Sequence, residues 1–191
     1  MSAQPDAEQV LRHFLISLFE HSDVLSQRLL PELLATQHDK LPAYHRADIE
    51  AVLGRSMDII RGWDPEVQAQ FIAGHPRIGE TKNLSVLSAK EQGGGTPPQV
   101  LARLAHLNVC YEQAYPGLRY ITFVNGRSRA VIAEEMEDKL RITHSLSPDQ
   151  PSVESFTPIE KYSHAWRQEL NRAVEDIGRI AHSRMDKLVV G

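Results

Sequence analysis

This sequence has one cysteine, no long apolar run and no excess of positive charge. Its one cysteine, Cys110, excludes a disulfide scaffold and a cysteine-based zinc or iron–sulfur site. No apolar run approaches the roughly 20 residues that a membrane-spanning helix needs, so we expect no membrane partner. Lys and Arg number 21 against 25 Asp and Glu, a formal charge of -4. Because nucleic-acid binding usually requires a basic face, we expect no nucleic-acid partner.

The two ends of the chain carry no recognisable targeting signal. The opening MSAQPDAEQV has neither a basic region nor an apolar stretch, so it predicts no secretory signal. The closing LVVG is not a peroxisomal tripeptide. We therefore expect a cytoplasmic protein, and a peroxisomal location through another signal stays open.

Apolar residues recur every three to four positions along most of the chain, which is the helical period. This pattern predicts an all-α fold over residues 1–191, a single compact domain of about seven to eight helices. One short extended segment is expected at 120–124, where YITFV is rich in β-formers. Helices are predicted at about residues 10–19, 22–34, 42–60, 65–73, 97–111, 128–140 and 158–188.

Proline and capping residues mark the ends of several predicted helices. Pro31 predicts a break in the second helix, because proline lacks the backbone donor. Asp64 and Pro65 form a strong helix start, and Ser128 is a candidate cap. The polar stretch 147–157 is expected to be a mobile loop, and Pro158 is expected to open the last helix.

Two polar residues fall on apolar helix faces. His75 follows Val67 and Phe71 at intervals of four, which places it at the edge of the core where its helix ends. A structural histidine favoured by the helix dipole and an acid–base histidine are both open. Arg184 lies on the buried stripe of the last helix, where an unpaired charge is costly. It predicts a salt bridge, a snorkelling side chain, or a fork for a carboxylate or planar ligand.

The segment around Ser88, Glu91 and Gln92 brings a hydroxyl, a carboxylate and an amide within one turn, before three glycines. By composition alone, a solvated loop is the simpler interpretation, and no phosphate-binding motif is present. The nine histidines show no metal-ligand spacing, so we expect no metal site. Cys110 falls beside a helix stripe and is expected to be a buried, inert thiol.

Taken in order, several short motifs resemble the OHCU decarboxylase family, whose substrate is 2-oxo-4-hydroxy-4-carboxy-5-ureidoimidazoline. The resemblance covers about residues 10–190. The motifs are GHPRIGE at 74–80, S-x-x-EQ at 88–92, LN-x-x-Y at 107–111, the extended piece at 120–124 followed by GRS at 126–128, and IA-x-x-RM-x-x-L at 180–188.

The resemblance implies an all-α homodimer without a metal or organic cofactor, which releases CO2 and forms (S)-allantoin in urate breakdown. It places the catalytic residues at His75, Glu91 and Arg184. It places the substrate contacts at Pro76, Ser88, Gln92, Ile121, Phe123 and Val124, those near Ile121 to Val124 being backbone contacts. The chain departs from the family pattern in a shorter loop after His75, where RIGE replaces the commoner DLAG, and in an insertion near 147–162.

The substrate chemistry agrees with the absence of a cofactor motif. The carbon that loses CO2 neighbours a C=N bond, so the substrate itself accepts the electron pair and no pyridoxal or thiamine group is required. Two alternatives stay open from the sequence: a non-catalytic helical module that binds a ligand or forms an adaptor dimer, and a hydrolase acting on a ureide ring.

Overall fold

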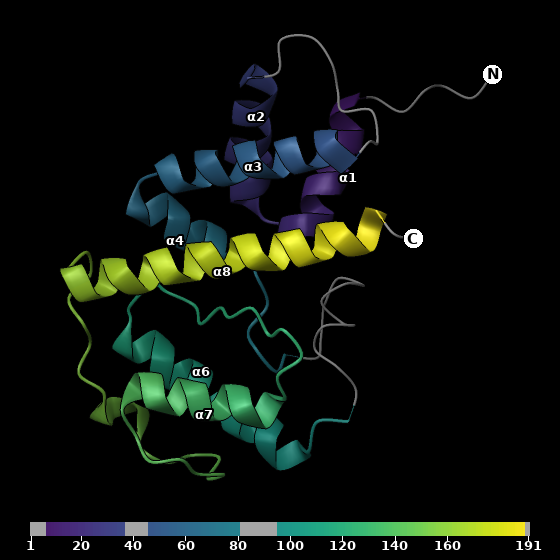
Figure 1. Cartoon of the computed structure of the whole chain (residues 1–191). Helices are drawn as coiled ribbons and strands as arrows, with labels where there is room; N and C mark the ends of the chain where they lie inside the picture. The colour runs from purple at the N-terminus through teal and green to yellow at the C-terminus, as the bar shows by residue number, and fades with distance from the viewer. Residues whose placement is uncertain (1–6, 37–45, 81–94, 190–191) are drawn as a thin grey trace. The chain divides into compact units, whose positions relative to one another are not determined.

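The computed structural model describes residues 7–36, 46–80 and 95–189, and these parts of the chain are helical with no strand (Figure 1). The α-helices are α1 (Ala7–Phe19), α2 (Leu30–Thr36), α3 (Arg46–Gly62), α4 (Pro65–Ala73), α6 (Pro98–Ala114), α7 (Arg129–Leu140) and α8 (His164–Val189). A π-helical turn, η1 (Leu25–Leu29), precedes α2, and a 3-10 turn, η2 (Val153–Ser155), precedes α8. The predicted all-α class is confirmed.

The chain divides into two compact units. The outer unit comprises residues 1–75 and 174–191, and the central unit comprises residues 76–173. Helix α8 therefore contributes its first ten residues to the central unit and the remainder to the outer unit. The assignment of one domain over 1–191 stays a prediction.

The outer unit has a core of leucine and aromatic side chains. Phe71 of α4 is its centre, with ring centroids 5.8 Å from Phe19 and 5.5 Å from Trp63. Other fully buried members of this core are Leu15, Leu18, Leu25, Leu29, Leu33, Val52, Ile60, Ile72, Ile177, Ala181 and Met185. The helical stripes of the sequence correctly predict nearly all of these positions.

Pro31 does not break its helix, which corrects the sequence prediction. Residues 23–36 are continuously helical, and the backbone N–H of Leu30 donates to the carbonyl of Leu25 rather than to that of Ser26. A proline ring clashes with the carbonyl four residues before it, here that of Gln27. The wider π turn relieves that clash, and Pro31 then occupies the first turn of α2, where its missing N–H costs little.

The predicted boundaries of α4 are confirmed. Asp64 occupies the N-cap position without a side-chain hydrogen bond, Pro65 begins the helix, and Gly74 follows its last residue. A Cβ atom at Gly74 would lie 2.6 Å from the Cβ of Ser22, so glycine is required for this close approach. The backbone N–H of His75 donates to the carbonyl of Ile72 at 3.0 Å, which holds His75 against the end of the helix.

The central unit is built on α6 and α7, which pack side by side (Figure 1). Leu104, Leu107 and Tyr111 of α6 are buried with Ile132 and Met136 of α7. The first turns of α8 add Trp166, whose indole N–H donates to the carbonyl of Pro116 at 2.9 Å. Residues 118–124 run between α6 and α7 with neither helix nor ladder, which confirms the predicted extended segment.

The segment before α8 differs from its prediction. Residues 147–157 are anchored to α6, because the fully buried Arg103 donates to the carbonyls of Ser147 and Gln150 while it pairs with Glu137. Helix α8 begins at His164 rather than at Pro158. Tyr162 has φ of 68°, a left-handed conformation that a helix cannot include, and Ser163 Oγ accepts from the Trp166 N–H at 3.4 Å.

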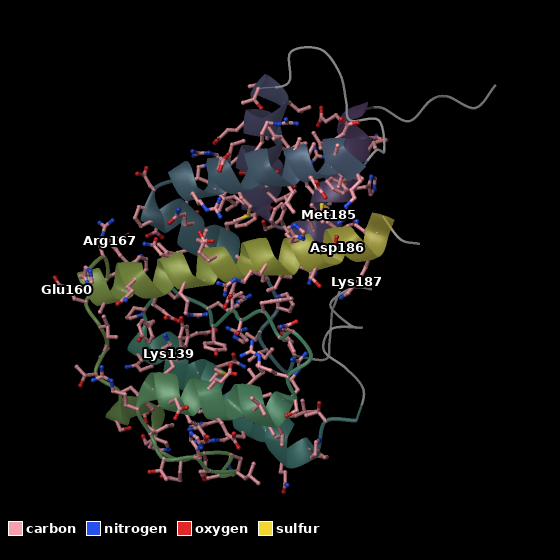
Figure 2. All side chains as sticks on the ribbon, viewed as in Figure 1. Lys139, Glu160, Arg167, Met185, Asp186 and Lys187 are labelled. Carbon is pink, nitrogen blue, oxygen red and sulfur yellow. The ribbon has the colours of Figure 1, made fainter. Side chains whose placement is uncertain are left out.

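Helix α8 is amphipathic in the outer unit. Met185 is buried there, while the neighbouring Asp186 is partly exposed and pairs with Arg46 at 2.8 Å. Figure 2 labels Met185 and Asp186 near the C-terminal end of α8. Two residues expected on its apolar side or just before it are instead exposed: Leu188 at 43% and Tyr162 at 41%. Among the described helices, none combines the length and the apolar content that a bilayer span requires.

Candidate active site

His75 is buried at the C-terminal end of α4, as the helix spacing predicts. Its imidazole is 3% exposed, and its ring packs edge-on against Phe71 with centroids 5.7 Å apart at 74°. The side chain therefore lies beside the aromatic core of the outer unit. Acid–base chemistry there would take place in a largely water-free setting, where electrostatic effects are stronger than in water.

Arg184 is 3% exposed on α8, and it has the partner that its burial demands. Its Nη1 lies 2.8 Å from Oε1 of Glu20 and donates to the carbonyl of Leu18 at 3.2 Å. The salt bridge that the sequence left open is therefore present. Ligand binding by the same guanidinium stays a prediction.

Glu20 is the residue that sequence reasoning missed. It directly follows α1, is 7% exposed, and has φ of 65°, a conformation that favours glycine or asparagine after a helix. The helix dipole disfavours a negative charge at this end. The signal available in the sequence was an acidic residue directly after the helix predicted at about residues 10–19, where the helix dipole disfavours its charge. The ion pair with Arg184 offsets the unfavourable backbone conformation and helix-dipole interaction of Glu20.

His75 and Arg184 are both attached to the end of α1. Arg184 reaches Leu18 and Glu20 directly. His75 reaches the same end through Phe71, which contacts Phe19, and through Gly74, which lies against Ser22. Both residues thus belong to the outer unit and connect to the end of α1, and each is almost fully buried.

The motif after His75 forms a tight turn at the start of the central unit, beginning at Pro76. The Arg77 backbone N–H donates to Glu80 Oε2 at 2.8 Å, and the Glu80 N–H donates to the Arg77 carbonyl at 3.1 Å. Gly79 has φ of 80°, and a Cβ there would lie 3.1 Å from Leu104. Asn108 donates to the Ile78 carbonyl at 3.0 Å. The glycine and asparagine of the quoted motifs thus position this turn.

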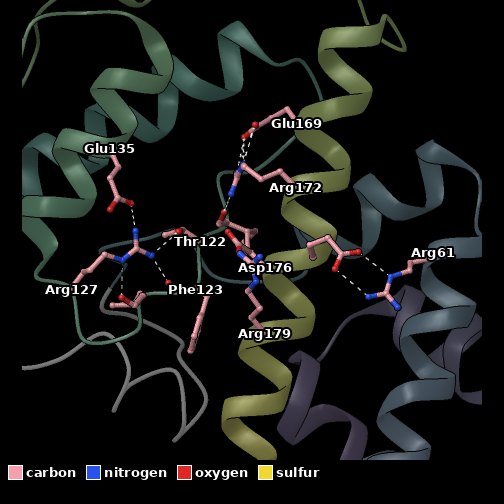
Figure 3. A network of polar contacts seen from close by, with 12 residues as sticks. Arg61, Thr122, Phe123, Arg127, Glu135, Glu169, Arg172, Asp176 and Arg179 are labelled. Atoms are coloured by element: carbon pink, nitrogen blue, oxygen red, sulfur yellow. Dashed lines mark hydrogen bonds and ion pairs between the residues drawn. The ribbon is translucent and has the colours of Figure 1, made fainter.

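The extended segment at 121–124 is held by arginine side chains (Figure 3). Arg172 of α8 donates to the Ile121 carbonyl at 2.8 Å. Arg127 donates to the Val124 carbonyl at 3.0 Å and to the Phe123 carbonyl. Ile121 is buried, whereas Phe123 and Val124 are half-buried. The three predicted contact residues of this segment therefore lie together in the central unit.

Arg172 also binds a buried carboxylate, Glu169. Glu169 is 4% exposed and accepts from Tyr111 Oη at 2.7 Å, from Lys139 Nζ at 2.8 Å, and from Arg172. Burial by itself raises the pKa of Glu169, but the hydrogen bonds and charge of Arg172, with those from Lys139 and Tyr111, hold that pKa below its usual value. Burial, followed by the charge of Glu169, raises the pKa of the Tyr111 phenol well above its usual value.

A pocket of about 380 Å³ opens in the central unit, on the side of Glu169 that faces Tyr115 and Lys139. None of the predicted site residues lines it. Ser88, Glu91 and Gln92 lie outside the described residues. Within the described ranges, no group of three or more His, Cys, Asp or Glu side chains is arranged to hold a metal ion.

Comparison with known proteins identifies one family. The family model for OHCU decarboxylase matches residues 3–150 of the chain. No curated protein and no solved structure matches. The matched range contains every predicted site residue except Arg184, which lies beyond it on α8 with Glu169 and Arg172. Membership implies a decarboxylase of purine catabolism.

Proposed function

The chain belongs to the OHCU decarboxylase family, and we propose that it converts 2-oxo-4-hydroxy-4-carboxy-5-ureidoimidazoline into (S)-allantoin and CO2 without a cofactor. The observation that supports the proposal is that a buried imidazole, His75, and a buried guanidinium, Arg184, each connect to the end of α1, His75 through Phe71 and Arg184 through Glu20. A buried imidazole and a buried guanidinium are the groups that this proton transfer and charge development require.

The reaction balances without an external electron acceptor. The bond between the ring carbon and its carboxylate breaks, and its electron pair forms a double bond to the neighbouring carbon. The π electrons of the former C=N bond move to nitrogen, which takes up a proton. The resulting enol then loses its hydroxyl proton and gains a proton on one face of the neighbouring carbon, which gives a single enantiomer of allantoin.

In this proposal His75 handles the proton of the substrate hydroxyl. Glu91 orients the ring or ureido donors and assists proton delivery, while Ser88 and Gln92 bind the substrate's polar groups. Pro76 and the segment containing Ile121, Phe123 and Val124 supply the remaining contacts. Positioned proton transfer typically contributes ~10²–10⁴-fold to the rate.

Arg184 stabilises the developing anion or a carbonyl oxygen of the substrate. Its contact with Glu20 at 2.8 Å fixes the orientation of the guanidinium before substrate binds. A donor that is already oriented needs no reorganisation during the reaction, which is the basis of electrostatic catalysis in a dry site. Glu20 would then be a positioning residue for Arg184.

We extend the proposal to a cytoplasmic homodimer, as the family resemblance implies. Sedimentation equilibrium of the purified chain tests the dimer, because a mass near 21.5 kDa at all concentrations would contradict it. A tagged chain followed by fractionation distinguishes the cytoplasm from the peroxisome.

One observation favours the non-catalytic alternative. Arg184 already has protein partners in Glu20 and Leu18, as a purely structural arginine would. In that case the chain would bind a ligand without turning it over. A ureide-ring hydrolase, the other alternative, would consume the substrate without releasing CO2.

The test uses freshly generated substrate followed by circular dichroism, with CO2 measured in parallel. The proposal expects faster decay than the spontaneous reaction, one equivalent of CO2, and the signal of (S)-allantoin. Racemic product at the spontaneous rate would support a binding module. Substrate loss without CO2 would support a hydrolase.

A further inference from the structure

The family resemblance implies that residues 121–124 contact the substrate through their backbone, and we infer that Arg172 and Arg127 are the positioning residues that fix this extended segment for that contact. This inference rests on the proposed function, because it takes that segment as part of the substrate site. Both arginines, the segment and their carboxylate partners belong to the central unit.

A segment without helix or ladder must satisfy its carbonyl groups in another way. Here arginines do so: Arg172 binds the Ile121 carbonyl, and Arg127 binds those of Phe123 and Val124. Arg127 also donates to Thr122 Oγ1 at 3.1 Å. Four consecutive residues are therefore each contacted by one of two guanidinium groups.

A carboxylate orients each of the two arginines. Arg172 makes a two-pronged contact with Glu169, at 2.7 Å from Nη2 and 3.0 Å from Nε, and Arg127 pairs with Glu135 of α7. Glu169 is also bonded to Tyr111 of α6 and Lys139 of α7. The position of the segment thus depends on three helices through a network in which Glu169 and Tyr111 are buried and the other side chains are half-buried.

The planar fork of arginine suits this arrangement. Arg172 uses Nε and Nη2 on Glu169 while Nη1 reaches the Ile121 carbonyl, and its guanidinium lies 5.3 Å from the centre of the Tyr120 ring. Lysine has one compact ammonium on a flexible stem and cannot reproduce this fork. The geometry therefore requires arginine rather than positive charge alone.

The hydrogen-bonding polarity of this backbone segment follows from the arginine contacts. Among the described residues, the backbone N–H groups of 121–124 donate to no protein acceptor, while three of the four carbonyls are bound by arginine. The segment thus presents donors. The matching ligand groups are acceptors, which in a ureidoimidazoline are its carbonyl and carboxylate oxygens.

Arg172→Lys and Arg127→Lys test the inference, with Arg61→Lys as the matched control. Arg61 makes a similar two-pronged contact with Glu175 of α8, at 3.0 and 3.2 Å, but that pair is exposed and belongs to the outer unit (Figure 3). The control thus makes the same chemical change to an arginine that contacts the same helix but does not reach the segment.

The first readout is independent of activity. Nitrogen-15 relaxation gives order parameters of ~0.85 for rigid backbone and below ~0.6 for flexible backbone. We expect rigid values for the amides of 121–124 in the unchanged chain and in Arg61→Lys, and a clear fall in both test variants. Unchanged order parameters in both test variants would overturn the inference even if the decarboxylase proposal holds.

The second readout is turnover of the proposed substrate. A misplacement of the order of 1 Å can cost ~10²-fold in rate, so we expect kcat/KM to fall by about 10–100-fold in each test variant and to stay unchanged in Arg61→Lys. If the unchanged chain shows no decarboxylation, the proposed function fails while the order parameters still decide the positioning role. If Arg172→Lys does not fold, Arg127→Lys alone decides, because its partner Glu135 is 34% exposed, whereas Glu169, the partner of Arg172, is 4% exposed.

Titration with (S)-allantoin, the proposed product, tests the donor polarity. We expect the amide proton resonances of 121–124 to shift in the unchanged chain and to shift less in Arg172→Lys. Shifts confined to other parts of the chain at saturating allantoin would overturn the assignment of these N–H groups as ligand donors.

Discussion

Breaking the buried pair between Glu20 and Arg184 should destabilise the chain strongly. Their side chains are 9% and 3% exposed and 2.8 Å apart, so neither charge can turn to solvent without local unfolding. Glu20→Gln leaves the guanidinium buried opposite a neutral amide. Removing one partner of a buried ion pair typically costs about 3–5 kcal/mol, because an uncompensated charge stays behind. Arg184→Met leaves a buried carboxylate and should cost a similar amount.

The double variant separates the pair from its surroundings. With both charges gone, the desolvation penalty also disappears, so Glu20→Gln combined with Arg184→Met should be less destabilised than the sum of the single variants. Neighbouring residues in one ion pair typically show coupling of about 0.5–3 kcal/mol.

Urea unfolding at neutral pH measures these effects through the midpoint, provided that the slope is unchanged. For a chain of this size, a loss of 3–5 kcal/mol corresponds to a fall of roughly 6–20 °C in Tm. Single variants within about 0.5 kcal/mol of the unchanged chain would refute the reasoning, since that is the range of ordinary surface substitutions. Additive single and double variants would show that the two side chains do not act as a pair.

Three further predictions follow from other contacts. His75→Ala should lower turnover of the proposed substrate by at least ~10²-fold with an unchanged far-ultraviolet circular dichroism spectrum, and unchanged enantioselective turnover would refute its assignment. The pKa of Glu169 is lowered in the folded chain, so its ionised form contributes stability above the unfolded-state pKa of about 4.3, and this contribution is lost as the pH falls through the folded value. Glu169→Gln should therefore flatten the acid side of a plot of urea midpoint against pH, and an unchanged slope there would contradict this. Gly79→Ala and Gly126→Ala both place alanine at positive φ, 80° and 77°, but only Gly79 is crowded, by Leu104. A left-handed alanine costs roughly 1–2 kcal/mol, so Gly126→Ala should show about that loss in urea unfolding and Gly79→Ala more. Equal losses of unfolding free energy in the two variants would contradict this, because they would mean that the Leu104 side chain moves aside at no cost.

Much of the secondary structure could be predicted because its causes are local. The start of α4 at Asp64 and Pro65 and the cap of α7, where Ser128 Oγ accepts from Val131 N–H at 3.2 Å, depend on residues within one turn. The two wrong helix predictions, the break at Pro31 and the start at Pro158, also have local causes, but amino-acid composition does not reveal them. A π turn before Pro31 and the left-handed Tyr162 changed where helices continue and begin, and neither leaves a distinctive pattern of residue types.

The candidate site also has features that the sequence predicted and one that it did not. Helix spacing placed His75 at the edge of the core and Arg184 on a buried face, and the motifs indicated the family that the comparison confirms. The sequence did not identify Glu20 as the partner of Arg184, because that pair joins residues near the two ends of the chain.

The amino-acid sequence alone determined the helices, the apolar faces and the need of Arg184 for a partner, since periodicity and the cost of burying charge act along one helix. Only the tertiary structure decided which carboxylate meets that arginine and which carbonyls Arg172 and Arg127 bind. Those contacts link helices and an extended segment, and hydrogen bonds between distant parts of the chain depend on how the backbone packs, which no local pattern encodes.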